Sequence, residues 1–278
     1  MLNLEKYAGL PIRLDDDFNL VFEDGLPPVT PQLREISAMR NYIKDASSTF
    51  WRKSVYDMYR GIAKPEDGAT LKDAGIQYDI TVLFPGKIGD EFAKTNGHYH
   101  SFQEGTRIRF PEIYEVIYGK VFFMIQSATP DLEKLQEACV ITVEKGEKAV
   151  IPPGFGHVMI NASDDVAVTA NWQPTANASD YSSYEKHNGA AYYVIESERL
   201  SADGKRTTKE PEFVPNLNYK EIPKLIHARP RELPQYNLRS AWPMYASAVQ
   251  DPAKLDFLPH PANYLEELTP EKLFTNQK

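Results

Sequence analysis

Three histidines and one glutamate in this sequence have the types and the spacing of metal ligands. His98 and His100 flank Tyr99, and alternate residues of a β-strand point to the same face. Glu112 opens another predicted strand, so its carboxylate can reach the same point from the side. His157 follows a Pro/Gly turn and supplies a third imidazole. This set of nitrogen and oxygen donors suits Fe(II), Mn(II), Ni(II), Zn(II) or Cu(II).

The four candidate ligands fall in two sequence blocks. The first is Gly97-His98-Tyr99-His100 with Glu112 and Gly119, and the second is Gly146-x5-Pro152-x-Gly154-x2-His157-x3-Asn161. At average residue usage, the second block arises by accident on the order of once in ten thousand chains of this length. An octahedral ion held by four side chains keeps two open positions, where adjacent oxygens of a substrate can bind.

The residues around these blocks alternate with the period of a β-strand. The predicted strands cover residues 78–84, 113–118, 120–126, 139–144, 148–151, 157–161, 166–172 and 191–196. Gly119 and the pair Lys145-Gly146 are predicted hairpin turns. No predicted strand precedes a long helix, so the pattern favours an all-β barrel or sandwich over a parallel α/β sheet.

The segments on either side of the strand region differ from it in composition. Residues 1–74 are predicted to form an arm with a short strand at 19–22, followed by one or two amphipathic helices between Pro31 and Arg60 that pack on the barrel. Residues 75–200 are predicted to form the barrel itself. Residues 201–278 are rich in proline, so we expect an ordered extension that wraps over the barrel or a neighbouring subunit.

Composition excludes several classes of protein. The 278 residues are 42% hydrophobic and 25% charged, as in globular proteins. A net charge of −8 disfavours binding to nucleic acid or anionic membranes. Cys139 is the only cysteine, which excludes an intramolecular disulfide and predicts a small buried side chain. Charges occur throughout the N-terminal residues and no apolar run spans a bilayer, so we expect a cytoplasmic protein without a secretory signal or membrane span.

Both blocks resemble the paired motifs of the cupin superfamily, and this resemblance implies a double-stranded β-helix, the jelly-roll barrel. The second block matches in spacing. In the first block, Phe92 replaces a glycine and the stretch from His100 to Glu112 is longer than usual. Glu104 has the usual distance from the histidines and is a rival ligand. We predict Glu112 because Gly119 follows it at the interval of the motif, whereas Glu104 lies in a predicted loop.

Residues 75–200 are similar to the cupin-type glucose-6-phosphate isomerases of archaea and some bacteria. The similarity rests on Thr81-Val82-Leu83-Phe84-Pro85-Gly86, Thr95-Asn96-Gly97-His98-Tyr99-His100, Glu112-Ile113-Tyr114 and Ile151-Pro152-Pro153 with His157 and Asn161. The metal ligands that it implies are His98, His100, Glu112 and His157. The substrate-site residues that it implies are Thr81, Thr95, Gly97, Tyr114 and Tyr181. Threonine hydroxyls and a glycine N–H are suitable donors to a phosphate.

The resemblance is incomplete at the sugar end of the site. Gln173 and Ser179 stand where the family carries a tyrosine and a histidine. The activity that the resemblance implies is metal-dependent interconversion of glucose 6-phosphate and fructose 6-phosphate. Three alternatives stay open: a non-haem iron dioxygenase, an isomerase of a different sugar, and a sugar-binding regulatory cupin. Oxygen uptake identifies the dioxygenase, and metal-dependent binding without turnover identifies the regulatory protein.

The expected cofactor is one divalent ion. Fe2+ is the first expectation and Mn2+, Ni2+ and Zn2+ are the alternatives, because isomerisation needs no redox change at the metal. The ion would hold the C1 and C2 oxygens of an open-chain sugar phosphate and stabilise the developing negative charge. Glu112 is the expected carrier of the proton between the two carbons, with hydride transfer as the competing route, and Tyr114 relays protons among the hydroxyls. The resemblance also implies a homodimer.

Overall fold

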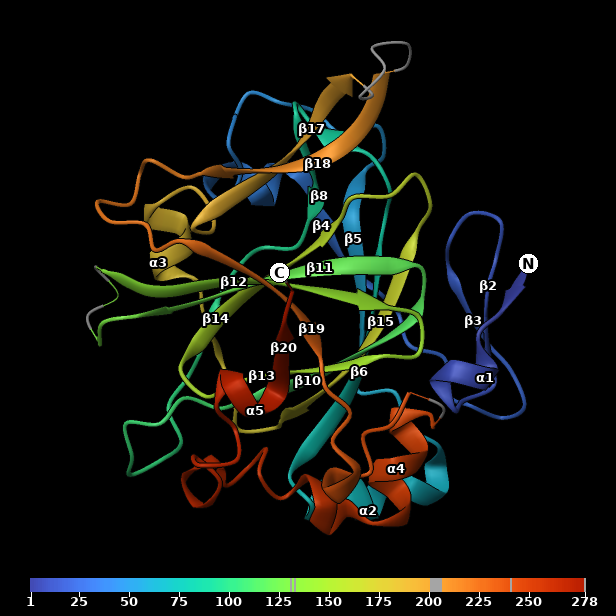
Figure 1. Ribbon diagram of the computed structural model, residues 1–278. Coiled ribbons are helices and arrows are strands. Elements are labelled where there is room, and N and C mark those ends of the chain that lie inside the picture. Colours follow the sequence, from blue (N-terminus) through green and yellow to red (C-terminus); the bar gives the residue numbers. More distant parts are fainter. Residues whose placement is uncertain (131, 133, 201–206, 241, 278) are drawn as a thin grey trace.

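Two curved β-sheets form the centre of the computed structural model, which describes residues 1–130, 132, 134–200, 207–240 and 242–277 (Figure 1). The strands of the first sheet are β4 (Gln32–Glu35), β5 (Ser54–Arg60), β6 (Ile76–Leu83), β10 (Glu112–Tyr118), β13 (Lys148–Ile151) and β15 (Ala167–Pro174). Their order in the sheet is β13-β10-β15-β6-β5-β4.

The second sheet contains nine strands. They are β7 (Lys87–Ile88), β8 (Glu91–Lys94), β11 (Lys120–Ala128), β12 (Leu135–Glu144), β14 (Phe155–Asn161), β17 (Tyr192–Leu200), β18 (Thr207–Pro215), β19 (Leu225–Pro230) and β20 (Phe274–Asn276). Their order is β18-β17-β8-β14-β11-β12-β19-β20, with β7 beside β8. Every predicted strand between residues 78 and 196 is therefore present. Buried aromatic side chains pack between the two sheets: the ring centres of Tyr114 in β10 and Phe123 in β11 lie 4.7 Å apart. The prediction of an all-β barrel is confirmed.

Two predicted hairpin turns are instead corners between the sheets. At Gly119 the chain leaves β10 in the first sheet and enters β11 in the second, and at Lys145-Gly146 it returns from β12 to β13. Gly119 has a φ of 81°, and a Cβ there would lie 2.8 Å from the Val166 carbonyl oxygen. Only glycine fits this conformation easily. The hairpin predictions were wrong because strand partners are set by contacts distant in sequence, whereas the turn signal is local.

The N-terminal segment differs from its prediction. β1 (Leu2–Asn3), β2 (Ile12–Leu14) and β3 (Leu20–Phe22) form a small sheet beside α1 (Glu5–Ala8), so the strand predicted at 19–22 is confirmed. The amphipathic helices predicted between Pro31 and Arg60 are wrong. This stretch forms β4, a 3-10 helix (Ile36–Tyr42) and β5, which pairs with β6 in the first sheet. The prediction was wrong because apolar residues in this stretch recur mostly at three- and four-residue steps, whereas contacts with β4 and β6 decide that β5 is a strand.

The described part of the C-terminal segment adds strands to the second sheet and a helix beside the first. β19 lies parallel to β12, and β20 lies antiparallel to β19. α4 (Met244–Gln250) packs under the first sheet, where the Trp172 indole N–H donates to the Met244 carbonyl oxygen at 3.2 Å. The remaining helical segments are α2 (Gly68–Asp73), α3 (Ser182–Lys186), α5 (Pro270–Leu273) and 3-10 turns at Pro65–Asp67, Pro234–Tyr236, Pro252–Leu255 and Pro261–Asn263. The division at residues 75 and 200 stays a prediction; the β5–β6 and β17–β18 pairs cross it.

A buried ion pair within the first sheet lies where this C-terminal segment packs against it. The Lys148 Nζ lies 2.7 Å from a Glu115 carboxylate oxygen, and both side chains are almost fully buried. The other Glu115 oxygen accepts the Met244 N–H at 2.7 Å. Burial raises the pKa of Glu115 to about 7, although Lys148 and the Met244 N–H oppose this shift. The pair therefore holds charge inside the core at the point where α4 docks.

Two expectations from composition also have a structural outcome. Cys139 lies in β12 with 9% of its surface exposed, as predicted for a small buried side chain. Burial raises the pKa of its thiol to about 12, so the thiol stays protonated. Across the residues that the structure describes, the helices are too short or too polar to cross a membrane.

Candidate metal centre

The structure brings the four predicted ligands together inside the barrel. His98, His100, Glu112 and His157 each offer one ligand atom, and these atoms lie within 4.8 Å of one another. His100 belongs to β9 (Tyr99–His100), Glu112 begins β10, and His157 lies in β14. His98 and His157 exchange two backbone hydrogen bonds, of 3.2 Å and 3.0 Å, which fix their imidazoles side by side. The cluster therefore draws on strands of both sheets.

The unpartnered atoms of this cluster fit a cation. The Glu112 Oε2 lies 3.1 Å from the His100 Nε2 and 3.2 Å from the His157 Nε2. The Glu112 Oε2 and the His100 Nε2 are nevertheless buried without a hydrogen-bond partner. Buried polar atoms without partners cost free energy. A divalent ion bound among them would satisfy these atoms together, so the donor set suits a metal.

Neighbouring groups orient the ligands. The Nδ1 of His100 lies 2.8 Å from the Phe110 carbonyl oxygen, which assigns the proton to Nδ1 and leaves Nε2 free to bind a metal. His98 makes a similar but longer contact of 3.4 Å with the Asn96 carbonyl oxygen. The Asn171 amide donates to the Glu112 Oε1 at 2.7 Å, so Oε2 faces the histidines. Such outer contacts raise metal affinity by holding each ligand in place.

The charge states also suit metal binding. Burial lowers the pKa of His98 well below its ordinary value, and burial likewise lowers the pKa of His157. Both rings are therefore neutral and can donate a lone pair. Burial alone would raise the pKa of Glu112, but the adjoining His100 and His157 hold it well below its ordinary value. The carboxylate is ionised, which gives the centre a negative charge for a cation.

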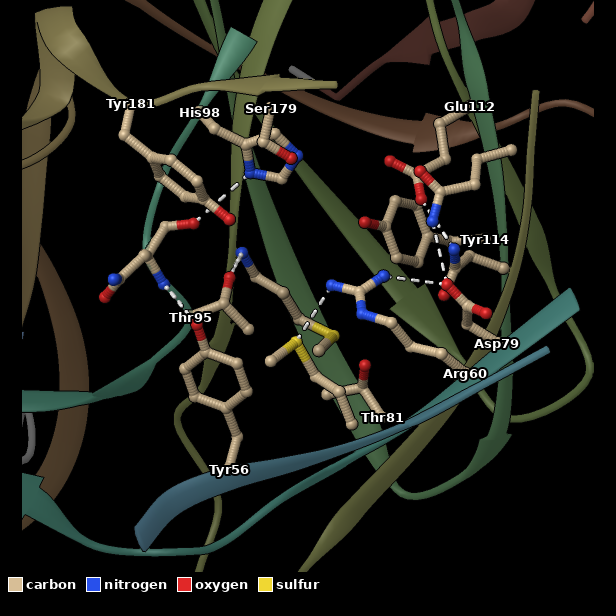
Figure 2. A pocket seen from close by; sticks show the side chains of 15 residues that line it. Tyr56, Arg60, Asp79, Thr81, Thr95, His98, Glu112, Tyr114, Ser179 and Tyr181 are labelled. Atoms are coloured by element: carbon tan, nitrogen blue, oxygen red, sulfur yellow. Dashed lines mark hydrogen bonds and ion pairs between the residues drawn. The ribbon is translucent and has the colours of Figure 1, made fainter. Parts of the chain in front are cut away.

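A pocket opens beside the cluster and contains most of the predicted substrate residues. Thr81, Thr95, Tyr114 and Tyr181 line it, together with His98 and Glu112. In Figure 2, His98 and Glu112 approach the pocket from one end, and Thr81 lies toward the other. The Tyr114 hydroxyl lies 3.0 Å from the His157 Nε2, and the Tyr181 ring centre lies 5.3 Å from that of His98. A ligand in this pocket would contact the cluster directly.

The hydroxyl groups of Thr95 and Tyr114 can each donate a hydrogen bond to a ligand. The Thr95 hydroxyl oxygen accepts the Met159 N–H at 3.0 Å, which leaves its own O–H to donate to a ligand. Burial raises the pKa of Tyr114 far above its ordinary value, and the neighbouring Glu112 carboxylate raises it further. Tyr114 therefore keeps its proton at neutral pH.

Gly97 has a steric role in the structure and does not line the pocket. A Cβ at this position would lie 2.1 Å from two ring carbons of Tyr184, whose side chain is completely buried. The Tyr184 ring is also confined by Gly156, where a Cβ would meet the Tyr184 hydroxyl at 2.8 Å. Position 97 requires glycine because the Tyr184 ring of α3 (Ser182–Lys186) packs directly on the backbone next to His98.

We expect Gly97→Ala to lower the free energy of unfolding by about 1–3 kcal/mol, because the new methyl overlaps a ring that has no room to move. Urea unfolding measures the change. Gly68→Ala is the matched control, since a Cβ at Gly68 meets open space at the start of α2. We expect that variant to be as stable as the original protein or slightly more stable. A Gly97→Ala protein with unchanged stability would contradict this account.

Sequence reasoning missed several residues of the pocket. They are Tyr56, Met58, Arg60, Asp79, Asn96, Met159 and Asn171. Those on β5 were missed because that segment was predicted to be helical. Asp79 and Asn171 could have been found, because Asp79 alternates with the predicted site residue Thr81 along β6, and Asn171 alternates along β15 with Gln173, which stands at a family site position.

The departures from the family pattern also lie at the pocket. Gln173 and Ser179 both line it. The Gln173 amide donates to the Asp79 Oδ2 at 2.8 Å, and Asp79 also holds Arg60 through an ion pair of 2.9 Å. The rival ligand Glu104 lies exposed in a turn outside the cluster. Glu112 is therefore the carboxylate that joins the three histidines.

Comparison with known proteins finds one family. The family model described as glucose-6-phosphate isomerase (GPI) matches residues 31–211, more than half of the chain. The glucose-6-phosphate isomerase of Thermococcus onnurineus is 30% identical over 198 residues, which are 69% of this chain and 92% of that protein. The Thermococcus litoralis protein of the same name is 31% identical over 185 residues, 64% of this chain and 87% of that protein.

Proposed function

Because the chain belongs to the glucose-6-phosphate isomerase family, we propose that it interconverts glucose 6-phosphate and fructose 6-phosphate in the pocket described above. One observation carries the assignment to this site: three histidines and a glutamate converge beside the predicted substrate residues Thr81, Thr95 and Tyr114. The departures at Gln173 and Ser179 lie in the same pocket, and we assign their amide and hydroxyl to the sugar hydroxyls.

We assign His98, His100, Glu112 and His157 to one divalent ion. Fe2+ is our first assignment, with Mn2+, Ni2+ and Zn2+ as alternatives of the same ligand preference. When bound, such an ion supplies Lewis-acid stabilisation of the negative charge that develops on adjacent sugar oxygens. The Glu112 Oε2 and the His100 Nε2 support this assignment, because both atoms are buried without a hydrogen-bond partner.

The protein's own side chains perform the proton transfers. With the C1–C2 end of the open-chain sugar against the cluster, Glu112 takes the proton from C2 of the aldose and returns it to C1 to give the ketose. The C2–H bond breaks and a C1–H bond forms, while Tyr114 carries the hydroxyl proton from O2 to O1. Asn171 holds the Glu112 carboxylate in place through its 2.7 Å hydrogen bond. Thr81 and Thr95 donate hydroxyl hydrogen bonds toward the phosphate.

We expect removal of the metal by a chelator to lower the isomerase rate by about a thousandfold, because the developing negative charge then lacks several kcal/mol of stabilisation. The assay follows fructose 6-phosphate under anaerobic conditions before and after dialysis against EDTA. Adding back Fe2+, Mn2+, Ni2+ and Zn2+ in turn identifies the active ion. Full activity in protein shown by elemental analysis to be free of metal would contradict the assignment, and oxygen consumption would indicate a dioxygenase.

We also propose that the chain forms a homodimer, as the family resemblance implies. Sedimentation equilibrium measures the assembly mass, and a mass equal to one chain at micromolar concentration would contradict this proposal.

A further inference from the structure

The paired strands β4 and β5 present one face to the pocket. In their register Arg34 lies opposite Tyr56, and Gln32 lies opposite Met58. Residues directly opposite each other in an antiparallel pair point to the same side of the sheet. Tyr56 and Met58 line the pocket, so Arg34 lies on the pocket side as well. This face belongs to the N-terminal segment, outside the predicted barrel.

Arg34 carries a charge that the protein itself does not neutralise. Its guanidinium carbon lies 5.9 Å from the centre of the Tyr56 ring. Its Nε is buried and has no hydrogen-bond partner. Within the described part of the chain, no carboxylate forms an ion pair with Arg34. A partly buried guanidinium in this state gains free energy from an anion that reaches it.

The charged groups that line the pocket do not offer this charge. Arg60 is held by Asp79 through an ion pair of 2.9 Å, and its Nε donates to the Gln32 side chain at 3.2 Å. Glu112 belongs to the metal cluster and is negative. Burial raises the pKa of Tyr56 to about 12, only partly opposed by Arg34, so Tyr56 adds no negative charge at this end. A sugar phosphate carries two negative charges, and Arg34 is a cation without an ion-pair partner among the described residues, beside the pocket-lining Tyr56.

We propose that the phosphate of the substrate binds against the β4–β5 face, with Arg34 as its charge partner. This inference rests on the proposed function and extends it by assigning the anion. A guanidinium suits this task because its planar N–H groups match phosphate oxygens in pairs. Thr81 lies opposite Met58 on β6, so its hydroxyl adjoins the same face. The Arg34 side chain thereby sets the preference for phosphorylated over neutral sugars.

The test compares Arg34→Gln with the original protein, both as full chains loaded with metal. Calorimetric titration with inorganic phosphate and with fructose 6-phosphate gives the two dissociation constants. We expect both constants to rise at least tenfold in Arg34→Gln. In the isomerase assay we expect KM to rise by a similar factor, while kcat stays within about threefold, because phosphate binding is common to the ground and transition states.

Lys53→Gln is the matched control. Lys53 directly precedes β5 and its side chain is 73% exposed, paired with Glu35 at 3.4 Å. This substitution also removes one positive charge close to the β4–β5 pair. We expect the dissociation constants for inorganic phosphate and fructose 6-phosphate to stay within twofold. Arg34→Lys keeps the charge and loses the planar donor pair, so we expect an intermediate affinity. It also serves as the informative variant if Arg34→Gln fails to fold.

The outcomes separate this inference from the proposed function. Unchanged phosphate affinity in Arg34→Gln, or in Arg34→Lys where only that variant folds, overturns the inference. Failure of the original protein to bind inorganic phosphate and fructose 6-phosphate also overturns it. Phosphate binding that depends on Arg34, in a protein that does not isomerise fructose 6-phosphate, upholds the anion site and refutes the isomerase.

Discussion

Replacing Glu112 with glutamine is expected to lower the isomerase kcat by about 10²–10⁴-fold, the usual contribution of a positioned general base. Glutamine keeps the shape of the side chain and can still receive the Asn171 amide, whose hydrogen bond to Glu112 is 2.7 Å long. It carries no charge and accepts no proton from carbon. The measurement is the rate of fructose 6-phosphate turnover together with the metal content of the same preparation, so that loss of the metal is distinguished from loss of the base.

Glu104→Gln is the control for this experiment. Glu104 satisfies the usual spacing of the motif, but it lies exposed in a turn. We expect its substitution to leave kcat and metal content unchanged. A Glu112→Gln protein with full metal and full rate would contradict the role of Glu112. Retention of the substrate hydrogen during turnover in heavy water by the original protein would favour hydride transfer between the carbons.

Replacing Lys148 with methionine is expected to lower the free energy of unfolding by about 3–5 kcal/mol, because Glu115 is left buried without its partner. The raised pKa of Glu115 gives the sign of the pH dependence. The contribution of Glu115 to the free energy of unfolding is fully present below pH 4.5, the ordinary pKa of a glutamate. It is lost as the pH rises through about 7. The Lys148→Met variant should therefore be weakest above pH 7, which urea unfolding at pH 6 and pH 8 measures.

Two further variants test the cause of that loss. In the double variant Glu115→Gln with Lys148→Met, the amide oxygen can still accept the Met244 N–H, and the unpaired charge is gone. We expect this protein to recover most of the stability. Lys120→Met removes an exposed partner of Glu144, at 3.7 Å, and is expected to cost at most about 1 kcal/mol. A double variant as unstable as Lys148→Met would show that packing, and not charge, causes the loss.

The strand region of the fold was predictable because its signal is local. β-Branched and aromatic residues form short runs along β6, β10, β11, β14 and β15, and Gly, Pro, Asn and Asp separate these runs. The pairing of those strands was not predictable in the same way. Gly119 has the same turn signal in a hairpin and in a corner, and only the distant partners of β10 and β11 decide between them.

The grouping of His98, His100, His157 and Glu112, rather than Glu104, was predictable from residue types and spacing. The proposed anion-binding face of β4 and β5 was not. In the segment from Leu33 to Met58, apolar residues recur mostly at three- and four-residue steps, which favoured a helix over the strand β5. A helix in place of β5 does not bring Met58 opposite Thr81 or Arg60 opposite Asp79, which is the register that the structure shows. The role of Gly97 also depends on Tyr184, a contact that no local pattern contains.

The four ligands come from separate layers of the barrel: Glu112 from β10 in the first sheet, and His157 from β14 in the second. A cation bound at this point would hold the two sheets together. Its binding free energy would therefore include the free energy needed to keep the sheets packed. Binding and folding are then thermodynamically linked. A substitution that destabilises the packing of the sheets, even one as remote as Lys148→Met, should therefore lower the affinity for the ion without changing a ligand.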